Sequence, residues 1–203
     1  MQSGLQRVSV VGLGYVGLPT AATFAARGLE VIGVDINRSA VETINSGRAH
    51  IAEPDLDMVL IAAVTSGKLR AVTVPEPADA FIIAVPTPVT PDRRADISAV
   101  EAALASIAPV LRRGNLVVIE STSPVGTAEQ SARQMRALRG DLTFPDLAPE
   151  HSDVLIAYCP ERILPGQTLR ELVDTPTPSG ALEPCCCEEQ CETDLMDLKT
   201  CIV

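Results

Sequence analysis

The chain has 203 residues, 46% hydrophobic and 21% charged, which is enough for one sizeable core and too little for two full α/β domains. Its formal net charge of −10 excludes a nucleic-acid-binding surface, because neutralising phosphates takes an excess of Lys and Arg. No uninterrupted apolar segment approaches the roughly 18 residues that cross a bilayer, and the first residues lack the apolar segment of a signal peptide, so we expect a cytoplasmic protein without a membrane partner.

Six short runs rich in Val and Ile predict β-strands. Several of these runs are apolar at successive positions rather than at alternate ones, which is typical of parallel strands covered by helices on both faces. The runs span residues 7–12, 30–35, 70–74, 80–85, 115–120 and 153–158.

Helical patterns separate these strands. The first, over residues 18–27, has Pro19 in its first turn and Gly28 just beyond its end, as helix starts and stops prefer. Pro109 should bend or shorten the fourth. The alternation predicts an α/β fold with a doubly wound parallel sheet, the Rossmann arrangement, as a single domain over residues 1–174. The other helices are expected at residues 38–46, 55–66, 97–112 and 125–138.

The first strand leads into VVGLGYVGLP, which places glycines at positions 12, 14 and 17. Gly12 permits a tight turn out of the strand, and Gly14 lets the backbone approach a pyrophosphate. Gly17 lets the following helix pack closely on the sheet, and the start of that helix supplies N–H groups to phosphates. Three glycines at this spacing can also mark a turn and nothing more.

An acidic residue follows the second strand. Asp35 is placed to accept hydrogen bonds from the ribose diol of adenosine. This favours NAD over NADP, because a 2′-phosphate would meet the negative charge. Arg38 is a competing signal, since it could tolerate that phosphate or stack on adenine. Asp35 could also be an N-cap or turn residue.

Two polar loops follow the fourth and fifth strands, at the edge where open α/β sheets bind ligands. In AVPTPV, residues 84–89, two prolines stiffen the loop and should leave the Thr87 hydroxyl free to meet a cofactor. Such prolines can equally mean only a rigid turn. In ESTSPVGT, residues 120–127, Ser121, Thr122 and Ser123 could meet the cofactor, or one of them could cap the next helix.

The composition changes at residue 175. The tail, residues 175–203, holds five of the six cysteines and six acidic residues against one lysine, and we expect it to be atypical and disordered. Its CCCEEQC run could bind a soft metal but lacks zinc-ligand spacing, so no metal site is predicted. Cys159, between an apolar strand and Pro160, is interpreted as a buried thiol rather than a nucleophile.

Several segments together resemble the UDP-glucose/GDP-mannose dehydrogenase family. The wording CPERILPG, with Arg after Glu, is most similar to the branch of that family that acts on UDP-N-acetyl-D-mannosamine. The resemblance covers residues 7–174 and stops there. The segments, in order, are VVGLGYVGLPTAATFA, VIGVDIN, AEPDL, IAVPTP, ESTSPVG and AYCPERILPG.

The resemblance implies an NAD-dependent oxidoreductase of polysaccharide biosynthesis, which converts the C6 alcohol of a nucleotide sugar to a carboxylate in two hydride transfers. It places Glu161 near the reacting sugar, and Arg162 and Ile163 against the nucleotide sugar. Without the resemblance, Glu161 and Arg162 would be read as a solvated pair of opposite charges. The residues that it implies in NAD contact are Tyr15, Val16, Asp35, Thr87 and Thr122.

The family's nucleophilic cysteine and general-base lysine have no counterpart in this sequence, and Lys68 lies too early to replace the lysine. Pro165 stands where the UDP-glucose branch has a second glutamate, which disfavours glucose. The sequence therefore leaves two hypotheses: an enzyme acting on UDP-N-acetyl-D-mannosamine, or the truncated cofactor domain of one that is inactive alone; and a free-standing NAD-binding module without turnover. A UDP-glucose dehydrogenase or a hydroxy-acid dehydrogenase are lesser alternatives. The family forms homodimers largely through a middle domain, so dimerisation of this chain is doubtful.

Overall fold

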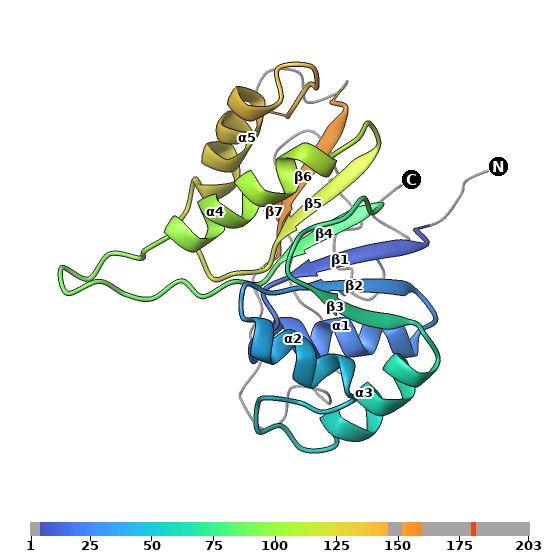
Figure 1. The fold of residues 1–203 in the computed structure, drawn as a ribbon. Helices are drawn as coiled ribbons and strands as arrows, with labels where there is room; N and C mark the ends of the chain where they lie inside the picture. The colour runs from blue at the N-terminus through green and yellow to red at the C-terminus, as the bar shows by residue number, and fades with distance from the viewer. Residues whose placement is uncertain (1–4, 146–151, 160–179, 182–203) are drawn as a thin grey trace.

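The computed structural model describes residues 5–145, 152–159 and 180–181. Within these ranges one sheet has the strand order β3-β2-β1-β4-β5-β6-β7, and helices cover both of its faces (Figure 1). Strands β1 to β6 pair in parallel, whereas β7 runs antiparallel to β6. The predicted doubly wound parallel sheet is confirmed.

All six predicted strands form, and most end one or two residues before the predicted end. All are short, and β1, β2, β4 and β5 are almost wholly buried, because helices pack on both faces. The strands are β1 (Arg7–Val11), β2 (Glu30–Val34), β3 (Leu69–Val72), β4 (Ala80–Ile83), β5 (Asn115–Ile119) and β6 (Val154–Tyr158).

Two helical layers enclose the sheet. Helices α1 (Gly17–Ala26), α2 (Arg38–Asn45) and α3 (Leu56–Thr65) pack on one face, in a core that includes Val10 and Ile82. Helices α4 (Ser98–Ile107) and α5 (Thr127–Leu138) pack on the other face, against Val11 and Ile83. Consecutive strand residues therefore contribute to opposite cores, which explains why several strands are apolar at successive positions.

The helix ends follow the glycine and proline signals. Gly28, at φ +92°, ends α1, and its N–H donates to Ala25 O at 2.9 Å. Helix α4 stops at Ile107, and a 3₁₀ turn (Ala108–Val110) containing Pro109 follows. The predicted shortening at this proline is confirmed, because proline cannot continue the helical hydrogen-bond ladder.

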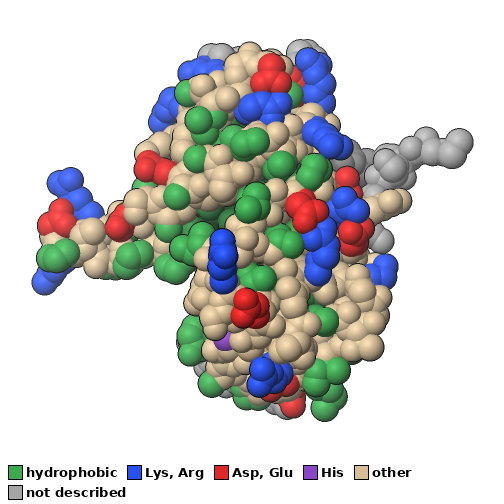
Figure 2. All heavy atoms as spheres, in the orientation of Figure 1, with side chains coloured by type: hydrophobic (Ala, Val, Ile, Leu, Met, Phe, Trp, Pro, Cys, Tyr) green, Lys and Arg blue, Asp and Glu red, His purple; other side chains and the backbone are tan. Residues whose placement is uncertain are grey.

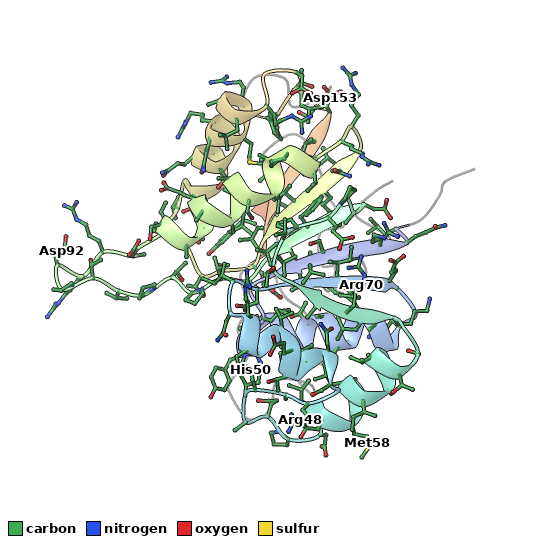
Figure 3. All side chains as sticks on the ribbon, viewed as in Figure 1. Arg48, His50, Met58, Arg70, Asp92 and Asp153 are labelled. Carbon is green, nitrogen blue, oxygen red and sulfur yellow. The ribbon has the colours of Figure 1, made fainter. Side chains whose placement is uncertain are left out.

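Two features of the fold were not predicted. Strand β7 (Gly180–Ala181) pairs with Tyr158 and Ala157 and lies inside the expected disordered tail; residues 175–179 and 182–203 of that tail lie outside the described residues. The second feature is an arm of residues 86–97 that extends away from the body, with Asp92 near its tip (Figures 1 and 3).

Charges of both signs are interspersed on the face drawn in Figure 2, while apolar side chains gather near its middle. Of the helices in the described ranges, none is long and apolar enough to span a bilayer.

Candidate functional site

A pocket of about 680 Å³ lies at the carboxyl ends of β1, β2, β4 and β5. Its volume falls in the range of small-molecule sites, roughly 300–1,000 Å³. It straddles the position between β1 and β4 where the strand order reverses, and open α/β sheets bind their ligands at that position. Its lining includes Gly12, Gly14, Tyr15, Val16, Asp35, Ile36, Thr87, Glu120, Ser121 and Thr122.

The three glycines have distinct surroundings. Gly12 has φ +93°, and a Cβ on it would lie 2.6 Å from Ala84 O. A Cβ on Gly17 would lie 1.9 Å from Gly12 O, so the first turn of α1 packs directly on the strand-to-helix turn. A Cβ on Gly14 would meet no atom within 4 Å. Two of the glycines are therefore required by the fold, and the third leaves its open side to the pocket.

The amino end of α1 faces this pocket, and the helix's own residues do not neutralise it. Val16 precedes the helix without a side-chain cap, and no acidic residue lies in the first turn. Free N–H groups and the partial positive charge of a helix start favour an anion at such a place. The pocket can thus hold a phosphate group beside Gly14, Tyr15 and Val16.

The Asp35 carboxylate accepts two backbone hydrogen bonds that the sequence did not predict. Its Oδ2 accepts from the Leu13 N–H at 2.9 Å and its Oδ1 from the Asn37 N–H at 2.8 Å. These bonds fix the carboxylate against the glycine loop, and each oxygen keeps a second lone pair for a ligand hydroxyl. The N-cap of α2 is Asn37, which accepts from the N–H of Ser39 and Ala40, so the N-cap interpretation of Asp35 is wrong. Its turn interpretation is confirmed, because a side-chain bond to the N–H two residues on is an Asx turn.

Apolar side chains continue the pocket beyond Asp35. Ile36 is 96% exposed and Tyr15 is 52% exposed, and both line the pocket together with Pro75. Such a surface suits a flat base, which gains from covering exposed apolar groups. Sequence reasoning missed Ile36, although its place next to Asp35 is a usable signal. Arg38, the first residue of α2, is exposed.

The loops after β4 and β5 are joined to each other. The Thr87 hydroxyl donates to Thr122 O at 2.7 Å, so the prediction of a free Thr87 hydroxyl is wrong. Helix α5 begins after Gly126, at φ +90°, and has no side-chain cap, which also rules out the capping role for Ser121, Thr122 or Ser123. Thr122 is exposed, and its hydroxyl makes no hydrogen bond to other described residues.

Glu120 is a pocket residue that the sequence reasoning did not single out. It follows β5 directly, is 1% exposed, and accepts from the Thr20 hydroxyl of α1 at 3.2 Å. A buried carboxylate is costly without hydrogen bonds, so this contact between α1 and the end of β5 matters for the fold. An acid directly after the apolar run NLVVI was the available signal.

The other candidate residues do not join this pocket. Cys159 is 3% exposed and packs in the α1-side core, as predicted for a buried thiol. His50, labelled in Figure 3, follows α2 and does not line the pocket. Across the described ranges no cluster of His, Cys, Asp and Glu could hold a metal ion. Glu161, Arg162 and Ile163 lie outside the described residues.

Six parallel strands in this order, an uncapped helix start at the switch point and an acid after the second strand define a Rossmann dinucleotide-binding domain. The family model of the UDP-glucose/GDP-mannose dehydrogenase family, NAD binding domain, matches residues 6–183. The chain belongs to this family, and the cofactor of the matched domain is NAD. The match extends past residue 174, the end that the sequence resemblance predicts.

Two curated relatives are similar over most of the chain. The NDP-N-acetyl-D-galactosaminuronic acid dehydrogenase of Ralstonia nicotianae is 60% identical over 181 residues, which is 89% of this chain and 43% of the relative. The UDP-N-acetyl-D-mannosamine dehydrogenase of Escherichia coli K12 is 56% identical over 179 residues, 88% of this chain and 43% of the relative. The chain therefore spans less than half the length of these relatives.

Solved structures agree with the assignment. The UDP-N-acetyl-mannosamine dehydrogenase Cap5O of Staphylococcus aureus has a TM-score of 0.80 at 42% identity, covering 87% of this chain and 42% of its own. The GDP-mannose dehydrogenase of Pseudomonas aeruginosa, solved as a ternary complex, has a TM-score of 0.79 at 28% identity, covering 87% of this chain and 41% of its own. Both likenesses support the family resemblance found in the sequence.

Proposed function

We propose that this chain is the NAD-binding portion of an enzyme that oxidises the C6 alcohol of UDP-N-acetyl-D-mannosamine to the uronate, in the cytoplasm and for polysaccharide biosynthesis. One observation carries the cofactor half of the proposal. The open side of Gly14, the uncapped start of α1 and the Asp35 carboxylate all face one pocket. The relatives named for this sugar, at 56% identity, and the segment CPERILPG support the substrate half.

The Ralstonia relative, at 60% identity, favours a second candidate sugar, an N-acetylgalactosamine nucleotide. Both candidates carry a 2-acetamido group and a C6 alcohol, so the same oxidation serves either. UDP-glucose is the weaker alternative, because Pro165 replaces the second glutamate of that branch.

Residues of this chain would bind and orient the reactants. The N–H groups at the start of α1 would hold the diphosphate, and Asp35 would accept hydrogen bonds from the adenosine ribose. Thr87 and Thr122 line the other half of the pocket, where the redox-active ring would lie. When bound, NAD supplies a two-electron hydride acceptor, and two equivalents take up the four electrons that separate an alcohol from a carboxylate.

We further propose that the 203 residues bind NAD without sustained turnover. Oxidation to the acid through a covalent intermediate needs a thiolate and a base that converge on the substrate. In the described part of the chain the thiol is the buried Cys159. Lys68 lies at the amino end of β3, on the opposite edge of the sheet from the pocket.

A coupled measurement tests both parts. The purified chain is titrated with NAD by calorimetry, and the same sample is then given UDP-N-acetyl-D-mannosamine or its galactosamine counterpart while the absorbance of NADH is followed. We expect saturable NAD binding and no continuing NADH formation. Steady NADH formation would overturn the proposal of no turnover, and absence of NAD binding would overturn the proposed function as a whole.

A further inference from the structure

We infer that Tyr158 is a positioning residue, which holds the loop after β5 in place for the nicotinamide half of the cofactor; this rests on the proposed function. Tyr158 is the last residue of β6. Its hydroxyl donates to Ser123 O at 3.0 Å and accepts from the Ser123 N–H at 3.0 Å. One side chain thereby fixes both backbone polar groups of a loop residue.

The order of the strands assigns this loop to the nicotinamide side. Asp35, after β2, lies on the side of the switch point where the adenosine ribose binds, and the diphosphate crosses at the start of α1. The remaining nucleoside must therefore extend over the ends of β4 and β5. Glu120, Ser121 and Thr122 of the β5 loop line the pocket there.

Two other side-chain contacts hold the pocket side of the loop. The Ser121 hydroxyl donates to Val85 O at 2.7 Å, and the Thr87 hydroxyl donates to Thr122 O at 2.7 Å. Both contacts come from the β4 side. Tyr158 is the contact from the β6 side, so the backbone around Thr122 is fixed from both of its neighbouring strands.

Beyond Ser123, the loop is held at the start of α5, where the Thr127 hydroxyl and N–H donate to Pro124 O at 2.7 and 3.2 Å. Pro124, Val125 and Gly126 are exposed, and regular helix begins only at Thr127. Among the described side chains, Tyr158 alone hydrogen-bonds to the backbone of Ser123. Without that hydroxyl the loop would keep its contacts to the β4 side and to Thr127, and would lose its contact to β6 at Ser123.

One substitution distinguishes the contribution of the Tyr158 hydroxyl from that of its ring. The ring of Tyr158 packs against the core on the α4 and α5 face, and phenylalanine would keep that packing. Tyr158→Phe therefore removes two hydrogen bonds at the loop without opening a cavity.

The test compares two ligands in the 203-residue chain, NADH and ADP-ribose, which lacks the nicotinamide. Two lost neutral hydrogen bonds of ordinary strength should weaken NADH binding by about 5- to 150-fold in Tyr158→Phe, with ADP-ribose affinity unchanged. The fluorescence spectrum of bound NADH should shift toward that of free NADH. The control is Thr90→Val, which removes a loop-holding hydroxyl from the arm, outside the pocket lining, and should leave both affinities unchanged.

A second variant tests the shared loop. Thr87→Val removes the hydrogen bond from the β4 side and should also weaken the binding of NADH but not that of ADP-ribose. In the double variant, the loss of NADH binding free energy should be smaller than the sum of the losses in the two single variants. Equal weakening of both ligands in Tyr158→Phe, an unchanged NADH affinity, or loss of folding would each overturn the inference. Failure of the unaltered chain to bind either ligand would instead contradict the proposed function.

Discussion

Gly14→Ala should weaken NAD binding without destabilising the fold. The added methyl would meet no atom within 4 Å, and Gly14 is not among the glycines with positive φ. The structure therefore accommodates alanine without strain. Because Gly14 lines the pocket beside the start of α1, the methyl would instead occupy the space through which a diphosphate approaches the backbone.

The expected magnitudes follow from that geometry. Replacing an unstrained glycine by alanine stabilises a protein by about 0.4–1 kcal/mol, through the unfolded chain, so the melting temperature should hold or rise by up to about 4 °C. Losing one hydrogen bond to a charged group costs about 1.5–3 kcal/mol. NAD should therefore bind roughly 10- to 150-fold more weakly.

Calorimetric titration with NAD and thermal unfolding without ligand measure the two effects. Gly28→Ala is the matched control, since its methyl also meets nothing within 4 Å but its φ is +92° and it lies outside the pocket lining. It should cost about 1–2 kcal/mol of stability and leave NAD affinity unchanged. If Gly14→Ala binds NAD as tightly as the unaltered chain, the glycine loop is not the diphosphate site.

Three further predictions concern single side chains. Asp35→Asn should weaken NAD binding about 3- to 10-fold and reduce the ratio of NAD affinity to NADP affinity. Titrations with both cofactors measure this ratio. Thr20→Val removes the hydrogen bond to buried Glu120 and should cost about 1–3 kcal/mol in urea unfolding. The Arg139 hydrogen bond lowers the pKa of Asp141 from 3.8 to about 2; the pair stabilises the fold above pH 3.8 and is lost as the pH falls through 2. Asp141→Asn should thus melt below the unaltered chain at pH 6, and the two should converge near pH 2.

The elements were predictable because their signals are local. Continuous apolar runs mark strands buried on both faces, and Gly28 and Pro109 end their helices through their own backbone limits. The α5 start was placed too early, since the left-handed turn at Gly126 delays it to Thr127. Strand β7 has two residues, which is too short for any periodic pattern.

The contacts within the site were not predictable in the same way. Asp35 bonds to Leu13 across 22 residues, and Thr87 to Thr122 across 35. Each contact depends on which strands become neighbours and in what register, and a single sequence does not state that. The sequence identified several residues that line the pocket, but it missed Ile36 and Glu120 and did not show that the Thr87 hydroxyl already donates to Thr122 O.

The central claim is that the glycine loop and Asp35 form a site for NAD. Its most direct test is calorimetric titration of the 203-residue chain with NAD, with NADP titrated in parallel. The account predicts saturable binding of one NAD per chain and weaker binding of NADP. No heat with NAD, or tighter binding of NADP, would contradict it.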